Sequence, residues 1–472
     1  MKKYLLVAVS LLLGSPALVS AQETVVLTLE KAIEIALSEN VSVKVADLEI
    51  QRAEYARKGT YASLFPQVDA NAAYQRTIKK QVMYMDFDMG SLMGGALGDD
   101  SAFPGMGDSG AGGKESGGKD TGGGIEVGRW NTYSGSISAG MPLVNAQLWK
   151  SLRISAQDVE LAVEKARSSR LETVTQVKQA FYAALLAKEV LNVYTQVYEN
   201  AVDNFRQTEM RYNVDKASEL DYTRAKANIA NAIPNMFDAE NSAFLSLWQL
   251  KAVMGIDLDT EVEVAGELED YAEHMLYDLA QGDNADLSRN SAMRQLAIQA
   301  EELANMVKLQ QYAALPSLAL QFNYSMNAMT NDFNFSEYKW TPYSFVGLSL
   351  SVPIFAGGKR HAAVRQAQVQ RDELKLQTDN TERQLRIAIR QYLSQMETGM
   401  KSYTSAEEAC NLAQKAYDIA TKSYNVGRST LTDLNDAQLA LTQARLGLCQ
   451  SVYGYLVAKA GLEQTLGYDF SE

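Results

Sequence analysis

Cysteine and histidine are scarce in this sequence. Among 472 residues there are two cysteines, Cys410 and Cys449, and two histidines, His274 and His361. Neither histidine has the spacing of a metal-ligand pair, and no nucleophile motif accompanies them. We therefore expect no enzyme activity, no catalytic residue, no metal site and no cofactor. The cysteines could pair in an oxidising compartment, but each lies in a helical pattern, and we favour two buried free thiols.

Basic residues are also fewer than acidic ones. Lys and Arg together number 44 against 57 Asp and Glu, and the formal net charge is −13 at pH 7. Because phosphate binding needs clustered Lys and Arg, we expect no nucleic-acid partner. The hydrophobic share of 46% excludes general disorder, and the chain is longer than one ordinary domain.

Long apolar runs are missing beyond the first residues. The run from Tyr4 to Leu13 is shorter than the roughly 20 residues that a membrane-spanning helix needs. Two lysines precede it, and Val19-Ser20-Ala21 supplies the small residues that a signal peptidase reads. We therefore predict a signal peptide over residues 1–21 and an exported mature chain. Any membrane role of that chain must come from β-strands or from surface attachment.

The sequence contains an internal duplication. Residues 211–218, RYNVDKAS, resemble residues 423–430, SYNVGRST, and an acid follows each at the same offset. These acids, Asp221 and Asp433, lie 433 − 221 = 212 residues apart. Other landmarks recur in the same order, which indicates one supersecondary unit used twice. We predict a first structural repeat over 22–254, an acidic linker over 255–285 and a second structural repeat over 286–472.

Glycine is concentrated in one segment of the first repeat. Of the 31 glycines, 14 fall between Gly90 and Gly124. A segment so rich in Gly, Ser and Asp cannot bury enough apolar surface to offset its ordering entropy, so residues 86–124 are predicted to be a flexible loop. A phosphate-binding glycine loop is the alternative, but the Lys-Ser/Thr ending and the strand-to-helix context are missing.

Four segments alternate between apolar and polar residues. In the clearest of them, Leu318, Leu320 and Phe322 alternate with Ala319 and Gln321. This period of two predicts strands with one apolar and one polar face, each long enough to cross a membrane when tilted. A soluble half-buried sheet would show the same pattern. If the strands lie in lipid, four are too few to close a barrel, so several chains must share one. The predicted strands are 67–78, 130–141, 317–328 and 343–354.

The segments between the strands favour long helices. No Pro or Gly occurs from Trp149 to Tyr212 or from Lys359 to Thr398. Apolar residues there follow a narrow 4-3-4-3 spacing, which is typical of a coiled-coil seam rather than of a globular helix. At 1.5 Å per residue the first helix would be roughly 95 Å long. The predicted long helices are 149–212, 218–254, 359–425 and 430–466, with shorter ones over 28–62 and 286–314.

In this order of elements the chain resembles the TolC family of outer-membrane efflux proteins. The resemblance covers nearly all of the mature chain, and its most specific pieces are Tyr424-Asn425-Val426-Gly427, residues 352–358 (VPIFAGG) and the acids Asp433 and Asp436. It implies a mostly α fold with a small membrane β part, in which duplicated long helices form an α-barrel. Four strands per chain would complete a shared twelve-stranded trimeric barrel.

The resemblance also implies a location and partners. The chain would lie in the outer membrane, in contact with its lipid, with a periplasmic helical extension and the glycine-rich loop outside the cell. It would form a homotrimer and work with a periplasmic membrane-fusion adaptor and an inner-membrane RND or ABC pump. Its function would be passive export through a duct of a tripartite efflux or type I secretion system. A periplasmic coiled-coil scaffold or surface adhesin without channel activity is the alternative.

The candidate site residues come from the same resemblance. The family closes its periplasmic entrance with a tyrosine, matched by Tyr424, and with acids matched by Asp433, Asp436 and, in the first repeat, Asp221. One departure is Ser429, which stands where well-studied members have an arginine, and another is Asp215, which replaces a glycine of the first turn. The helix-turn tips implied to dock the adaptor are Asn213, Val214, Asn425, Val426 and Gly427.

Two interpretations of the second-repeat acids remain open. Asp433 and Asp436 are three residues apart and share a helix face. Threefold symmetry would bring six carboxylates together near an axis and create a ring that attracts cations. The alternative is an ordinary solvated first turn, where acids favour the helix N-terminus.

Overall fold

The computed structural model describes residues 25–83, 125–272 and 286–468. The predicted signal peptide, the predicted glycine-rich loop and His274 lie outside these ranges, as does part of the predicted linker. The chain divides into a helical unit, made of residues 1–60, 150–311 and 357–472, and a strand unit, made of residues 61–149 and 312–356.

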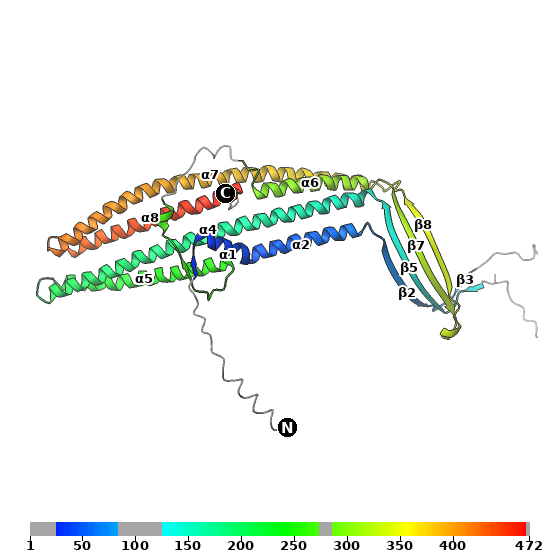
Figure 1. The fold of residues 1–472 in the computed structure, drawn as a ribbon, viewed down its shortest axis with the longest axis horizontal. Helices are drawn as coiled ribbons and strands as arrows, with labels where there is room; N and C mark the ends of the chain where they lie inside the picture. The colour runs from blue at the N-terminus through cyan, green and yellow to red at the C-terminus, as the bar shows by residue number, and fades with distance from the viewer. Residues whose placement is uncertain (1–24, 84–124, 273–285, 469–472) are drawn as a thin grey trace, which may run out of the picture. The chain divides into compact units, whose positions relative to one another are not determined.

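Two very long helices dominate the helical unit (Figure 1). Helices α4 (Ala146–Tyr212) and α7 (Lys359–Asn425) each have 67 residues, or about 100 Å at 1.5 Å per residue. No helix in the described part of the chain is both long and apolar enough to span a lipid bilayer. The remaining elements are α1 (Leu29–Glu39), α2 (Val41–Ala62), α5 (Glu219–Met254), α6 (Ser291–Tyr312), α8 (Leu431–Leu466), β1 (Val25–Leu27), β6 (Val262–Val264) and the 3-10 helix η1 (Leu268–Tyr271).

The helices confirm the internal duplication. Like the pair α4 and α7, helices α2 and α6 have equal lengths of 22 residues, and α5 and α8 have equal lengths of 36 residues. The offset of 431 − 219 = 212 between α5 and α8 equals the offset between Asp221 and Asp433, and α2 and α6 are offset by 291 − 41 = 250. Even the caps correspond, because Gly255 and Gly467 both end their helices in the left-handed conformation.

The prediction of a single helix over residues 28–62 is wrong. The chain breaks at Asn40, whose backbone is extended and whose side-chain amide donates to the Val253 carbonyl at 2.6 Å. In the second repeat, Asn290 donates in the same way to the Thr465 carbonyl at 2.7 Å. The side chain of each asparagine thus connects the start of one helix to the last turn of another by a hydrogen bond. Sequence alone could not show the break at Asn40, because Val253, which accepts its hydrogen bond, lies more than 170 residues away in the chain.

The backbone at Gly467, which caps α8, lies too close to Arg289 to leave room for a side chain. A Cβ there would lie 2.3 Å from the Arg289 carbonyl oxygen, and φ is +75°. We expect Gly467→Ala to lower the free energy of unfolding by at least about 2 kcal/mol, because the clash adds to left-handed strain. The matched control is Gly447→Ala in the same helix, where the added Cβ meets open space and should stabilise by about 1 kcal/mol. Thermal unfolding of the two variants measures both effects, and equal midpoints would contradict this account.

The main core of the helical unit gathers around the middle of α4. There Phe181 and Leu185 are almost fully buried and belong to one cluster with Leu250 and Met254 of α5 and Tyr455 of α8. The parallel pair β1–β6 and η1 complete this cluster through their own apolar residues. The burial of this apolar surface stabilises the contact of α4 with α5 and α8 at this position along the helices.

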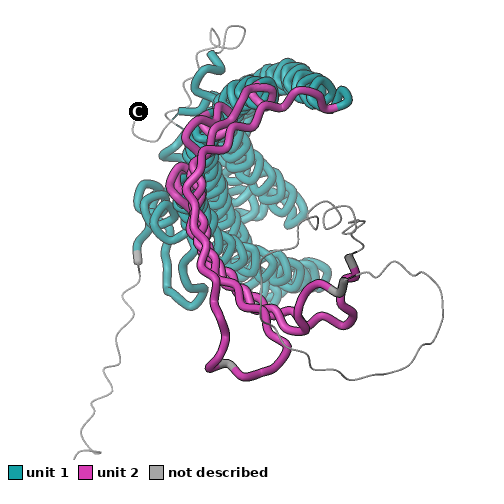
Figure 2. Tube along the Cα trace, turned by 90° about the vertical axis from the view of Figure 1, so that its right-hand side faces the viewer, with its two compact units in different colours: residues 1–60, 150–311, 357–472 teal, residues 61–149, 312–356 magenta. Residues whose placement is uncertain are grey.

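The strand unit is one antiparallel sheet with a short hairpin. Its four strands occur in the sheet in sequence order, β2-β5-β7-β8, and Figure 2 shows them as a curved band. All neighbours are antiparallel. The strands are β2 (Gln67–Arg76), β5 (Asn131–Val144), β7 (Ser317–Thr330) and β8 (Thr341–Ser351), and the hairpin pairs β3 (Gln81–Met83) with β4 (Ile125–Val127).

All four strands differ from their predicted bounds by one to three residues at one or both ends, and the differences at two prolines have a physical cause. Strand β5 continues through Pro142 to Val144, although proline cannot donate to a ladder, because the register shifts between these two residues. Strand β8 ends at Ser351 rather than at residue 354, before Pro353, whose missing N–H disfavours further pairing.

The register gathers most of the apolar side chains on one face of the sheet, although Phe345, opposite Asn323, lies on the other. Phe322 lies opposite Ala139 on one side and Val346 on the other, and opposite residues share a face. The adjacent Asn323 lies opposite Ser138 and therefore faces the other way. The apolar face is bare in the single chain: Val346, Leu348 and Leu350 are 69%, 67% and 66% exposed. Strands β2 and β8 are its edges, and neither pairs with another described strand on its outer side.

Candidate functional site

Two helix turns lie together at one end of the helical unit. The turn between α4 and α5 has Asp215 in the left-handed conformation at φ +55°, and the turn between α7 and α8 has Gly427 at φ +75°. These positions are equivalent, since 427 − 215 = 212. Glycine adopts this conformation without cost and aspartate tolerates it better than most residues, so the Asp215 departure leaves the turn intact. The predicted tips, Asn213, Val214, Asn425, Val426 and Gly427, are all exposed.

Tyr424 joins the two turns. Its side chain is 7% exposed and packs with Ala225 of α5 and with Leu431 and Leu434 of α8 in a small apolar cluster. Its hydroxyl lies 2.7 Å from the hydroxyl of Thr208 on α4. The predicted gate tyrosine is therefore buried within its own chain, between the two long hairpins.

Arg211 also contacts this end of α7. Its guanidinium donates to the carbonyl oxygens of Tyr424 and Asn425, both at 2.9 Å, and lies 4.8 Å from the centre of the Tyr424 ring. Sequence reasoning assigned no role to Arg211 or Thr208. A signal for Arg211 existed, because its counterpart in the duplicated motif is Ser423, so the two repeats differ at this position.

The structure does not bring the predicted acids to Tyr424. Asp221 accepts a hydrogen bond from the Ser218 hydroxyl at 2.7 Å, and Asp433 accepts one from the Thr430 hydroxyl at 2.7 Å. Asp433 also accepts from the Thr430 amide at 2.8 Å and completes a capping box at the start of α8. The bond from the Thr430 side chain, followed by that from its backbone, lowers the pKa of the Asp433 carboxyl below its ordinary value. Asp436 is exposed one turn further along α8.

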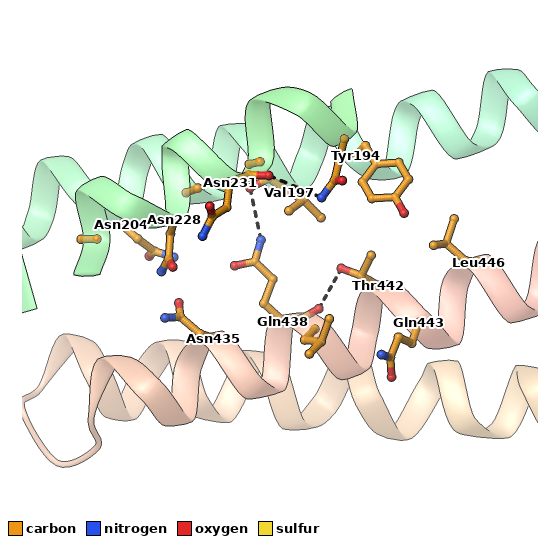
Figure 3. Close-up of a pocket in the computed structure, with 15 residues that line it drawn as sticks. Tyr194, Val197, Asn204, Asn228, Asn231, Asn435, Gln438, Thr442, Gln443 and Leu446 are labelled. Carbon is orange, nitrogen blue, oxygen red and sulfur yellow. Dashed lines mark hydrogen bonds between the residues drawn. The ribbon is translucent and has the colours of Figure 1, made fainter. Parts of the chain in front are cut away.

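A groove of about 510 Å³ lies next to this cluster, between α4, α5 and α8 (Figure 3). Its walls are rich in side-chain amides: Asn204, Asn228, Asn231, Asn235, Asn435, Gln438 and Gln443. Figure 3 shows Asn228 of α5 and Asn435 of α8 facing each other across the groove. Gln438 donates to the Val197 carbonyl of α4 at 3.3 Å. These residues present hydrogen-bonding groups but no net charge, so the groove suits water or neutral polar groups.

The groove follows from a polar coiled-coil seam that sequence reasoning missed. On α5, Ala225, Asn228, Ala232, Asn235 and Ala239 follow a 3-4-3-4 spacing, and the three alanines are nearly fully buried. Alanine and asparagine bury far less apolar surface than the leucines of a stable seam. The interface below the tips is therefore only loosely packed.

The sequence predicts no catalytic or metal-binding role for Cys410, Cys449 and His361. Cys410 and Cys449 are free and partly buried, and burial raises the pKa of the Cys449 thiol to about 11. His361 is exposed near the start of α7. Among the described residues, no group of three or more His, Cys, Asp and Glu side chains could hold a metal ion.

Long paired helices in a duplicated order, together with a sheet of membrane length that exposes an apolar face, are the features expected of a membrane-channel protein. The family model for the outer membrane efflux protein matches residues 32–256 and 284–468, and the chain belongs to this family.

Curated relatives have the same character. The chain is 23% identical over 356 residues to the outer membrane protein TolC of Escherichia coli, covering 71% of this chain and 70% of that protein. It is 24% identical over 343 residues to the alkaline protease secretion protein AprF of Pseudomonas aeruginosa, covering 71% and 69%. Neither supports the alternative of a scaffold or adhesin, and these relatives are channels rather than enzymes.

Solved structures show the same fold. The CmeC outer membrane channel of Campylobacter jejuni superposes with a TM-score of 0.69 at 18% identity, covering 93% of this chain and 85% of that one. The outer membrane protein VceC of Vibrio cholerae gives 0.66 at 16% identity, covering 93% and 96%. The predicted fold class is confirmed, and the chain is a TolC-like outer-membrane channel of an efflux or type I secretion system.

Proposed function

We propose that three copies of this chain complete one channel. The observation that carries the proposal is the open sheet: four strands expose an apolar face and leave edges at β2 and β8. Unpaired edges are not tolerated in lipid, and a single-chain membrane barrel has at least about eight strands. Three sister sheets joined edge to edge supply twelve strands, and the polar faces then line a water-filled pore.

The helical unit forms the periplasmic part of this channel. Its exposed tips, Asn213, Val214, Asn425, Val426 and Gly427, are the surface that a periplasmic membrane-fusion adaptor would contact. The adaptor links the channel to an inner-membrane pump of the RND or ABC class, which supplies the energy. AprF and PrtF, two of the relatives, are named as protease secretion proteins. The chain itself conducts cargo passively and catalyses no reaction.

The periplasmic entrance is gated by the residues around Tyr424. Closed hairpins bury this tyrosine, and separation of α4 and α5 from α7 and α8 would expose it. Asp433 and Asp436 then form the ring of acids at the entrance, and Asp221 supports the first-repeat turn through its bond with Ser218. The loosely packed seam of α5 favours such a separation because little apolar contact is lost.

Native mass spectrometry and planar bilayers test the proposal together. The purified mature protein should have the mass of three chains and should give discrete single-channel currents, small at first because the entrance is closed. A monomer that gives no current under any voltage would refute the channel. Trimers that give no current would support the trimeric assembly but would refute a conducting pore.

A further inference from the structure

A hollow of about 400 Å³ lies on the apolar face of the sheet. It is formed within the strand unit, by residues of β2, β5 and β7 and by Trp340, which directly precedes β8. Three small residues contribute to its walls, namely Ala70, Ala72 and Gly135. Larger apolar side chains border them, among them Ile137 and Met326. The hollow therefore has an almost entirely apolar lining.

The register of the strands explains why the surface is hollowed here. Ala72 is paired with Gly135, and Gly135 is paired in turn with Met326, so the three residues lie on the same face. A Cβ added at Gly135 would meet open space, and the strand has no positive φ at this position. The packing of the strands does not require glycine here. The missing side chain instead leaves apolar surface on which another molecule can lie.

Strand β2 leads from the hollow to a positive charge. Ala72, Tyr74 and Arg76 occupy every second position of the strand, so their side chains share the apolar face. At about 3.3 Å per residue, Arg76 lies roughly 13 Å beyond Ala72. Tyr74 stacks on Tyr133 between them, at a centroid distance of 4.9 Å. Arg76 is exposed, and its guanidinium lies 5.6 Å from the centre of the Phe333 ring, within the range of a cation–π interaction.

Basic residues are concentrated at this end of the sheet. The segments 76–80, 129–132 and 331–340 adjoin there, because Arg76, Asn131 and Thr330 lie opposite one another in the register. They contain five basic residues, Arg76, Lys79, Lys80, Arg129 and Lys339, against two acids, Asp332 and Glu337. The carboxylate of Asp332 accepts a hydrogen bond from the Thr330 hydroxyl at 2.6 Å. In a chain with a net charge of −13, this end of the sheet is thus locally basic.

An apolar hollow next to exposed cations fits a ligand with an apolar chain and an anionic head. Burial of the chain against apolar surface is favourable, and a guanidinium binds phosphate oxygens through charge-assisted hydrogen bonds. Tyrosines suit the level between the two parts, because one end of the ring is apolar and the other is polar. Inorganic phosphate would leave the hollow empty, and a neutral alkyl chain would make no use of Arg76. The ligand that uses both features is a phosphate-bearing lipid.

We propose that each chain binds one phosphate-bearing lipid at this place, with an acyl chain in the hollow and the phosphate on Arg76. This inference rests on the proposed channel function, because the apolar face must contact the bilayer. Strand β2 is an edge of the sheet, so the bound lipid lies beside the junction with a sister chain. A trimer then has three equivalent lipid sites.

Native mass spectrometry of the purified trimer tests the head-group contact. Phosphatidylglycerol and phosphatidylcholine with the same acyl chains are titrated separately, and the wild type should bind up to three molecules of phosphatidylglycerol at least about tenfold more tightly. Arg76→Gln should remove this preference, because the charge-assisted hydrogen bonds are lost. The control is Lys375→Gln, which removes an exposed positive charge from α7 and should bind both lipids like the wild type.

The contribution of the hollow is tested by filling it. Gly135→Leu and Ala72→Leu should each weaken phosphatidylglycerol binding at least about tenfold, because the acyl chain loses its apolar contact. Ala139→Leu is the matched control, since Ala139 is paired with Phe322 on the same face but does not line the hollow. Its affinity should equal that of the wild type. If Gly135→Leu trimers fail to assemble, Ala72→Leu decides, because Ala72 is exposed.

Three results would overturn the lipid site. They are equal affinity of the wild type for the two lipids, unchanged affinity in trimers of Arg76→Gln or Ala72→Leu, and displacement of the lipid by an equal concentration of inorganic phosphate. The last result would show a phosphate site to which the hollow adds nothing. A wild-type protein that forms no trimer would instead refute the proposed channel, so the two failures are distinguishable in the same spectra.

Discussion

Replacing Phe322 by arginine is expected to prevent stable insertion of the channel into lipid, whereas Asn323→Arg should insert normally. The two residues are adjacent on β7, but the register places Phe322 with Val346 on the apolar face and Asn323 on the polar one. Arginine on the lipid face of a membrane barrel costs about 2–4 kcal/mol at the bilayer midplane. A trimer carries three such charges, so the total cost is comparable to the stability of a domain.

Incorporation into lipid vesicles, followed by flotation, measures this difference directly. The Asn323→Arg channel should float with the vesicles and conduct with altered ion selectivity, because its new charge faces the pore. Equal flotation of the two variants would show that the apolar face does not contact lipid. Loss of both would indicate a folding defect of β7 rather than a difference between its faces.

Removing the charges of Asp433 and Asp436 is expected to abolish block of the pore by multivalent cations. Six carboxylates near one axis would bind such a cation in the trimer, and none would remain in the double variant. Asparagine is the better replacement at Asp433, because its side-chain oxygen can still accept the Thr430 amide hydrogen bond that begins α8. Alanine at both positions should also abolish the block, but it removes the carboxylate that completes the capping box and so destabilises the start of α8.

The pH dependence of the block gives an independent check. Hydrogen bonds from Thr430 lower the pKa of Asp433 below its ordinary value of 3.8, so this carboxylate stays charged to more acidic pH than an unbonded aspartate. A lowered folded-state pKa contributes stability above the unfolded pKa, and that contribution is lost as pH falls through the folded value. Block and capping should therefore both persist into acidic solution and be lost only as the pH falls through the lowered pKa of Asp433. Asp418→Asn, an exposed acid on α7, is the control, and block that survives in the double variant would reject the ring.

Much of the fold was predictable because its local signals agree with each other. The long helix α7 begins and ends at the predicted residues, since Gly358 precedes it, Gly427 follows it and a continuous seam runs between. The predicted start of the first short helix at residue 28 is also correct, because the Thr28 hydroxyl accepts from the Lys31 amide and caps α1. Period-two alternation in β7 located the apolar face correctly because the pleat converts sequence parity into side-chain direction.

The contacts between distant segments could not be predicted from one sequence. Nothing near Tyr424 indicates that its hydroxyl meets Thr208, which lies 216 positions away in the chain. The helix break at Asn40 likewise depends on the carbonyl of Val253. The resemblance to a known family identified the tyrosine and the acids, but their bonding in this chain depends on the particular residues opposite them. Ser429 illustrates this, since its hydroxyl donates only to the Ala420 carbonyl of α7 at 3.4 Å.

The most direct test of the shared barrel is cross-linking between its sheet edges. Both native cysteines are first replaced by alanine, and single cysteines are then introduced in pairs along β2 and β8, which have no strand neighbour on their outer sides in one chain. We expect one register of pairs to form disulfides between different chains and to give a covalent trimer on denaturing gels. Disulfides that form only within a single chain, or none along the whole length of both strands, would contradict a barrel completed by sister copies.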